Sequence, residues 1–230
     1  MTPLVLLPGM MCDARLFGPQ IAALSAGRTI HVPALTGAAS MAALAEAVLA
    51  EAPPRFALAG LSMGGILAME ILRQAPSRVT RVAFLDTNPR AELPEVQAGR
   101  EPQVARVRAE GLEPVLRREV FPNYLHEASD PALLDLCAEM ALALGPAVFA
   151  RQSRALRDRA GAEDVLARVR IPTLVLTGED DRLCPMDRHA RLCELIPHAR
   201  LVVVPRAGHL PTLEQPGAVT AALADWLTET

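Results

Sequence analysis

The sequence predicts an α/β protein with a doubly wound, mostly parallel sheet of about six strands. Short apolar runs recur along the chain, helical stretches separate most of them, and the runs are nearly continuous rather than alternating. Continuous apolar runs are typical of strands that helices cover on both faces. Strands that alternate with helices pair in parallel through right-handed crossovers.

Each apolar run is short enough for a strand, and a Pro, Gly or polar residue ends it. The six predicted strands are residues 3–8, 28–33, 55–60, 81–87, 172–178 and 199–205. The stretches between and after them carry apolar residues at helical spacing. The helices predicted there are residues 15–25, 40–51, 63–74, 186–196 and 216–228.

The alternation breaks once, between the fourth and fifth predicted strands. Residues 131–144 have apolar positions at helical spacing, with Asp130 as a candidate N-cap, Pro131 at the first helical position and Gly145 at the end. A second helix is predicted over 146–159. We therefore expect a core formed by residues 1–88 and 165–230, and a mixed-charge helical insertion, residues 89–164, that covers the carboxyl edge of the sheet as a cap.

The amino-acid composition excludes several classes of function. All 23 basic residues are arginine, which excludes mechanisms that need an internal lysine, such as a P-loop or a Schiff base. A net charge of -3 without a basic run argues against nucleic acid as a partner. No apolar run reaches the roughly 18 residues of a membrane span, and the first residues lack signal-peptide features, so we expect no membrane partner and a cytoplasmic location. No cofactor or metal is expected, since no histidine pair has ligand spacing.

Ser62 lies between Gly60 and Gly64, where a predicted strand ends and a predicted helix begins. Two glycines at such a corner indicate that main-chain atoms approach closely. The serine is then either a helix N-cap or the nucleophile of a strand–turn–helix elbow. An N-cap needs no partner residues elsewhere, whereas a nucleophile needs a base and a carboxylate.

His209 is the best candidate base, because it follows the sixth predicted strand at the carboxyl edge. We expect His31 to pack beside the sheet and His126 to lie in the insertion, at the surface or near substrate. His189 and His198 are expected to be solvated. The carboxylate that orients the base comes from the loop after the fifth strand, which holds Glu179, Asp180 and Asp181, or from Asp86 at the end of the fourth.

At this point the chain resembles the α/β-hydrolase superfamily, in particular its small capped bacterial esterase-like members. The resemblance spans nearly the whole chain and rests on LLPGMMCDARLF, GLSMGG, LDTNPR, GEDDRLCP and AGHLPTLEQP. It implies the α/β-hydrolase fold and a catalytic triad of Ser62, Asp181 and His209. Asp181 is selected because the family's acid stands four residues before a proline, here Pro185. One departure is Pro8 before Gly9, where family members usually have histidine.

The resemblance further implies an oxyanion hole formed by the main-chain N–H groups of Met10 and Met63. The side chains of Met11, Leu61 and Leu210 are then expected to line the substrate pocket beneath the cap helices, together with those of Met10 and Met63. With few aromatic residues, the expected substrate is a small-molecule acyl compound, a small to medium apolar carboxylic ester. A thioesterase or a cofactor-free C–C hydrolase would keep the same triad. A hydrolase-fold ligand sensor with little turnover is the third alternative, and a homodimer is compatible with the chain.

Overall fold

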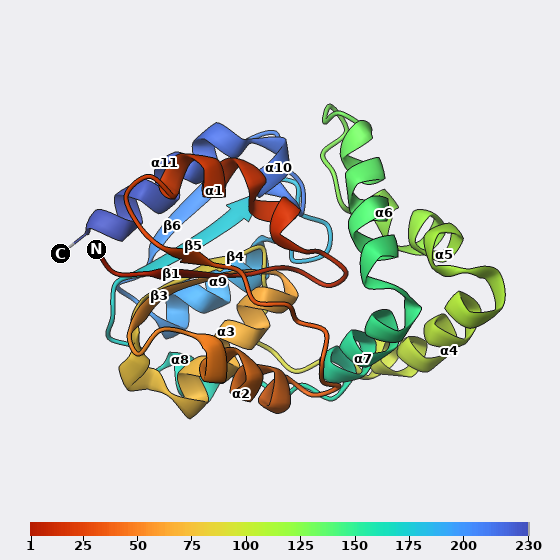
Figure 1. Ribbon diagram of the computed structural model, residues 1–230, viewed down its shortest axis with the longest axis horizontal. Helices are drawn as coiled ribbons and strands as arrows, with labels where there is room; N and C mark the ends of the chain where they lie inside the picture. Colours follow the sequence, from red (N-terminus) through yellow and green to blue (C-terminus); the bar gives the residue numbers. More distant parts are fainter. Residues whose placement is uncertain (230) are drawn as a thin grey trace.

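A single six-stranded parallel sheet organises the molecule (Figure 1). The computed structural model describes residues 1–229. The sheet has the order β2-β1-β3-β4-β5-β6, and each neighbouring pair is parallel. All six predicted strands are confirmed: β1 (Leu4–Leu7), β2 (Ile30–His31), β3 (Phe56–Leu61), β4 (Val79–Leu85), β5 (Thr173–Gly178) and β6 (Arg200–Val204).

The helices outside the insertion begin and end close to the predicted residues. They are α1 (Gly18–Leu24), preceded by the short 3-10 helix η1 (Ala14–Phe17), then α2 (Met41–Glu51), α3 (Met63–Gln74), α9 (Met186–Leu195) and α11 (Pro216–Thr228). Three short elements were not expected: η2 (Pro76–Arg78), α8 (Glu163–Leu166) and α10 (Pro211–Glu214). Ser40 caps α2, because its side chain accepts a hydrogen bond from Ala43 N–H at 3.2 Å.

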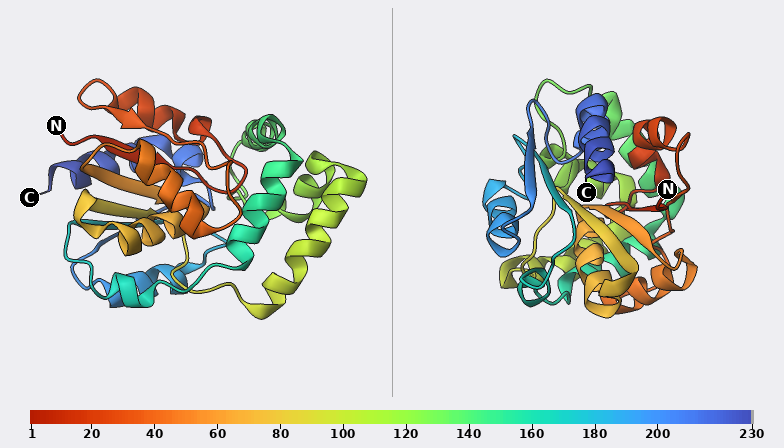
Figure 2. Two further views of the ribbon diagram at one scale, coloured as in Figure 1. Left: turned by 60° about the horizontal axis from the view of Figure 1, so that its bottom comes forward. Right: turned by 90° about the vertical axis from the view of Figure 1, so that its left-hand side faces the viewer.

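Helices cover both faces of the sheet, as the view along the strands shows (Figure 2). Alternate residues of β1 belong to opposite layers: Leu4 and Leu6 pack with the layer that contains Trp226 of α11, while Val5 and Leu7 pack with the layer that contains Leu67 of α3. All four residues of β1 are fully buried. This two-sided burial is why the strand is a continuous apolar run.

The order of the strands reverses at β1. The chain goes from β1 outward to β2 and then returns to β3 on the other side of β1, so the carboxyl ends of β1 and β3 lie side by side, with Leu7 opposite Gly60. In open parallel sheets, a crevice for ligands forms at such a switch point. The loop after β1 and the turn after β3 therefore face each other.

Between β4 and β5 the chain forms a helical group at the end of the sheet to which the carboxyl ends of the strands point (Figures 1 and 2). Its helices are α4 (Pro94–Glu110), α5 (Leu112–Glu119), the 3-10 helix η3 (Phe121–Asn123), α6 (Ala132–Leu144) and α7 (Pro146–Arg157). We refer to residues 89–164 as the insertion.

The sequence identified α6 and α7 but not α4 and α5. In α4 only Val104 and Val107 are buried, and Pro102 lies inside the helix, so no apolar stripe marks it. The predicted ends of α6 lie close to the observed ones. The Asp130 side chain accepts a hydrogen bond from Ala132 N–H at 2.9 Å, and Gly145, with φ 81°, ends the helix.

No single helix in residues 1–229 has both the length and the apolar composition to cross a membrane. Only α6 and α7 taken together meet those criteria, and the two helices meet at 97°.

Candidate active site

Ser62 occupies a strained corner between β3 and α3. Its backbone has φ 54° and ψ -116°, a region that residues other than glycine rarely adopt. The Ser62 side chain makes no capping hydrogen bond, so the N-cap interpretation does not account for the residue. The corner needs its glycines: a Cβ at Gly60 would lie 2.2 Å from Gly64 O, and one at Gly64 would lie 2.0 Å from Leu7 O.

Two neighbours hold the main chain of Ser62. Its N–H donates to Leu85 O at 2.9 Å, and its carbonyl accepts from the Thr87 hydroxyl at 2.8 Å. Thr87 N–H in turn donates to Nε2 of His189 at 3.2 Å. The half-buried Ser62 side chain thus extends from a corner whose backbone is fixed on both sides.

The prediction for His189 was wrong, because this side chain is fully buried rather than solvated. Burial lowers the pKa of His189 to about 4, so the imidazole is neutral and its Nε2 can accept the hydrogen bond from Thr87. His189, Leu192 and Ile196 are all buried and stand at positions i, i+3 and i+7. That spacing is the sequence signal that identifies the buried face of α9.

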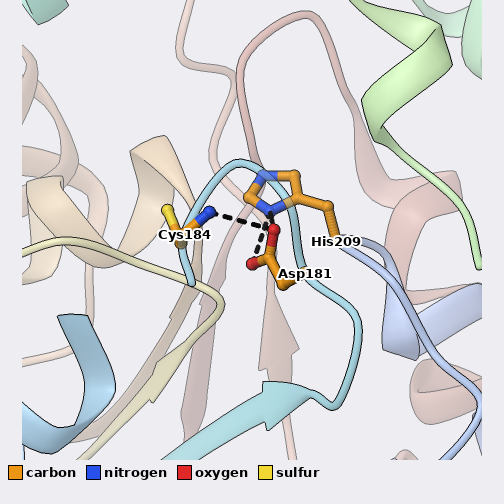
Figure 3. Close-up of side chains that lie close together, drawn as sticks. All are labelled: Asp181, Cys184 and His209. Atoms are coloured by element: carbon orange, nitrogen blue, oxygen red, sulfur yellow. Dashed lines mark hydrogen bonds and ion pairs between the residues drawn. The ribbon is translucent and has the colours of Figure 1, made fainter. Parts of the chain in front are cut away.

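His209 and Asp181 form a buried pair, shown in Figure 3. The Nδ1 atom of His209 lies 3.0 and 2.9 Å from the two carboxylate oxygens of Asp181. Asp181 Oδ1 also accepts from the main-chain N–H groups of Leu183 and Cys184, at 2.8 and 3.0 Å. Burial alone would raise the pKa of Asp181, but the charge and hydrogen bond of His209 and the two N–H donors outweigh it and lower the pKa to about 2. The carboxylate is therefore ionised.

Asp86 and Asp181, the two candidate carboxylates for orienting His209, have different surroundings. Asp86 is fully buried at φ 45°, and its Oδ1 accepts from Gly178 N–H at 2.8 Å. Burial, and then the negative charge of Asp181, raise the pKa of Asp86 well above its usual range. Asp181, and not Asp86, is the carboxylate that contacts His209.

Asp181, Cys184 and His209 are close enough to be considered as a metal site, since one potential ligand atom from each lies within 4.8 Å of the others. Burial and the negative charge of Asp181 raise the pKa of the Cys184 thiol well above its usual range, so this sulfur stays protonated. Both carboxylate oxygens of Asp181 lie within 3.0 Å of His209 Nδ1, and Oδ1 also accepts hydrogen bonds from two main-chain N–H groups. These contacts fit a histidine–carboxylate pair.

The loop after β1 lies close to the turn that holds Ser62. A Cβ on Gly9 would lie 3.6 Å from Ser62 Cβ. Met11 N–H is already bound, donating to Oε1 of Gln152 at 2.9 Å. By contrast, Met10 N–H and Met63 N–H, at the start of α3, donate no hydrogen bond within residues 1–229.

The predicted pocket residues divide between the two apolar layers. Met11, Leu61 and Leu210 are buried in the same layer, which also contains side chains from the insertion. Met63 instead packs its side chain in the opposite layer, against residues of α2 and α3. The Met63 side chain therefore does not add to the predicted pocket wall.

The insertion contacts the loops around Ser62 and His209 at three places. Tyr124 O accepts from His209 N–H at 2.7 Å, and the two rings lie 5.8 Å apart. Gln152 binds Met11 N–H, and Arg100 Nη1 lies 3.8 Å from Met10 Sδ. Sequence reasoning missed all three side chains, because no local pattern marks a contact between segments so far apart in the chain.

Among the other expected histidines, His126 and His31 are partly buried and His198 is exposed. His126 Nε2 lies 3.4 Å from Asp180 Oδ2, and His31 lies on the edge strand β2. Within the described residues Ser62 Oγ makes no hydrogen bond to His209. Hydrogen bonds of this kind often form only when substrate is bound.

Comparison with known proteins is consistent across sequence and structure. A family model for the alpha/beta hydrolase family matches residues 4–223. The pimeloyl-[acyl-carrier protein] methyl ester esterase of Pectobacterium carotovorum is 28% identical to this chain, over 95% of the chain and 91% of the relative. The 3-oxoadipate enol-lactonase 2 of Acinetobacter baylyi is 30% identical over 74% of the chain and 62% of the relative.

Two solved structures share the fold. A thermophilic esterase from Thermogutta terrifontis superimposes with a TM-score of 0.89 at 28% identity, covering 99% of this chain and 89% of that chain. The enol-lactonase from Burkholderia xenovorans LB400 gives a TM-score of 0.88 at 24% identity, covering 100% and 92%. At that identity the second similarity concerns the fold alone.

Proposed function

The chain belongs to the alpha/beta hydrolase family, and we propose that it is a serine hydrolase that cleaves small to medium apolar carboxylic esters through an acyl-enzyme intermediate. The observation that carries the proposal is the buried His209–Asp181 pair, in which an ionised carboxylate faces Nδ1 and leaves Nε2 available as a base. The strained corner at Ser62 and the esterase relatives support it further.

In the first half of the proposed reaction, Ser62 Oγ attacks the ester carbonyl carbon while His209 Nε2 takes the hydroxyl proton. Asp181 orients the imidazole and stabilises its positive charge. The unbound N–H groups of Met10 and Met63 stabilise the negative charge on the carbonyl oxygen. The bond to the alcohol oxygen then breaks, and His209 returns the proton to the leaving alcohol.

In the second half, water attacks the acyl-serine and gives its proton to His209. The bond to Ser62 Oγ breaks, the carboxylic acid is released, and His209 protonates the serine. The overall change is one ester and one water to one acid and one alcohol. The insertion serves as a cap that shields the site, since Tyr124, Gln152 and Arg100 all reach the loops around it.

The test is hydrolysis of p-nitrophenyl esters of increasing acyl length, with Ser62→Ala and, as a matched control, the exposed Ser77→Ala. We expect turnover that is lost in Ser62→Ala and retained in Ser77→Ala. A fluorophosphonate probe should label the wild type and not Ser62→Ala. Retained turnover in Ser62→Ala would overturn the proposal. Labelling without turnover on any ester would favour the ligand sensor, and faster cleavage of acyl thioesters would favour a thioesterase.

A further inference from the structure

Three charged side chains form a cluster where the insertion meets the core. Glu92 Oε2 lies 2.6 Å from Nη2 of Arg100 and 2.9 Å from Nη1 of Arg159. The side chains are 8%, 18% and 5% exposed, respectively. Among the described residues, no second carboxylate lies within 4.0 Å of either guanidinium. Two positive charges therefore share one negative charge, which leaves one positive charge uncompensated in a largely buried place.

Arg100 is the member of the cluster with hydrogen bonds still to make. Arg159 also donates to the carbonyls of Arg90 and Leu156. In Arg100, Nε is buried and has no acceptor in residues 1–229, and Nη1 has only the thioether sulfur of Met10 at 3.8 Å, a weak acceptor. A buried charged donor without an acceptor is costly, so its presence needs an explanation.

Arg100 contacts the loop after β1, which lies beside Ser62 in the candidate active site. Met10, which it contacts, follows Gly9, whose Cβ position lies 3.6 Å from Ser62 Cβ. The positive charge of Arg100 also acts on Tyr124, opposing the rise that burial causes in the Tyr124 pKa. Tyr124 packs its ring 5.8 Å from that of His209. Nη1 of Arg100 thus lies beside Met10, in the loop that approaches Ser62.

We propose that Arg100 binds a carboxylate at the far end of the substrate's acyl chain, so that the preferred esters are half-esters of dicarboxylic acids. This inference rests on the proposed function and specifies which class of ester the protein prefers. A carboxylate would accept from Nη1 of Arg100, whose present contact is the Met10 thioether, and would give the two guanidiniums two carboxylates. The acyl chain between the two ends would lie against the apolar side chains of Met11, Leu61 and Leu210.

The experiment compares two ester series of matched length. One series consists of monomethyl esters of dicarboxylic acids from succinic to pimelic acid, and the other consists of methyl esters of monocarboxylic acids. We expect the wild type to prefer the half-ester at one chain length. Arg100→Gln should lower the ratio of half-ester to neutral-ester kcat/KM by about 10- to 100-fold, mainly through KM.

Arg106→Gln is the matched control, because Arg106 lies on the same helix α4 and pairs with Glu119 away from the cluster. It should leave the ratio unchanged. Arg100→Lys keeps the charge and should restore part of the preference. Arg100→Gln leaves Glu92 paired with Arg159, so the variant should fold, and thermal unfolding checks this.

A binding measurement tests whether Arg100 binds a carboxylate independently of ester hydrolysis. Adipate should raise the melting temperature of the wild type and not that of Arg100→Gln. An equal loss on both ester series, or a wild type that prefers neutral esters, would overturn the inference while leaving the serine hydrolase intact. If no ester is cleaved and Ser62 is not labelled, the proposed function fails, and the adipate measurement still decides whether Arg100 binds a carboxylate.

Discussion

The side chain of Gln152 and the main chain of Met11 are joined across 141 residues by a hydrogen bond of 2.9 Å, from Met11 N–H to Gln152 Oε1. The amide nitrogen of Gln152 donates to Leu35 O at 2.8 Å. One fully buried side chain on α7 therefore fixes the loop after β1 and the segment after β2 at the same time. Because Met11 N–H is occupied, the N–H groups of Gly9 and Met10 are the ones in this loop that donate no hydrogen bond within residues 1–229.

Replacing Gln152 by leucine should destabilise the protein and impair catalysis. Met11 N–H and Leu35 O would both lose their partners in a buried place, which should cost about 2 kcal/mol of unfolding free energy or more. Because the loop after β1 would no longer be fixed, we expect kcat to fall more than KM rises. Urea unfolding and ester kinetics measure the two effects. Gln103→Leu, a half-buried glutamine of α4 that binds Glu119, is the control; an equal effect of the two changes would contradict the prediction.

His189 should make stability depend on pH below neutrality. The folded-state pKa of about 4 lies below the ordinary value of 6.5, so between these values the unfolded chain binds more protons than the folded protein. The unfolding free energy should therefore fall as the pH drops from about 6.5 to about 4, by up to about 3 kcal/mol. His189→Gln should flatten this part of the profile, whereas the exposed His198→Gln should not. Urea unfolding at several pH values is the measurement, and an unchanged slope in His189→Gln would refute the prediction.

Glu214 should be a positioning residue for His209. Its carboxylate accepts hydrogen bonds from the N–H groups of Gly208 and Leu210, on either side of His209, at 3.0 Å. It also accepts from His126 N–H at 2.8 Å and from the Ser129 hydroxyl at 2.7 Å. In Glu214→Gln an amide NH₂ group would face some of these donors.

We therefore expect Glu214→Gln to lower kcat about 10-fold and to reduce stability by about 2 kcal/mol. Ester kinetics and thermal unfolding are the measurements, and a pH–rate profile separates an effect on His209 from a general loss of structure. Glu127→Gln, at an exposed site nearby, serves as the control. Equal kinetics for the two variants would show that the loop holds His209 without Glu214.

Two glycines in helices should respond to alanine with opposite signs. Alanine normally favours a helix over glycine by about 1 kcal/mol. In α4, a Cβ at Gly99 meets nothing within 4 Å, so Gly99→Ala should be stabilising by up to that amount. In α3, a Cβ at Gly64 would lie 2.0 Å from Leu7 O, so Gly64→Ala should cost several kcal/mol or prevent folding. Thermal unfolding of both variants is sufficient, and a stable Gly64→Ala protein would mean that β1 and α3 can move apart.

The strands β1, β3 and β5 could be predicted because they are buried on both faces, which leaves a continuous apolar run in the sequence. The edge strand β6 is also an apolar run, although its Leu201 and Val203 are exposed. Helix α4 could not, because it buries few side chains and shows no apolar periodicity. Helix α5 was missed although its buried residues Leu112, Val115 and Leu116 have helical spacing. Ser62, Asp181 and His209 could be proposed as a catalytic set because each stands beside a local turn signal at the end of a strand. His189 was misjudged because the apolar spacing of α9 was not applied to a polar residue.

The sequence by itself determined the α/β class, the six strands and the local turns, because hydrophobic periodicity and glycine or proline punctuation depend on neighbours along the chain. The tertiary structure alone decided which groups meet. It placed Asp181 rather than Asp86 on His209, buried His189 beneath Thr87, and brought Gln152 and Arg100 to the loop after β1. Side-chain hydrogen bonds and ion pairs act over a few ångströms in space, and no pattern within one segment records which distant segment will lie at that distance.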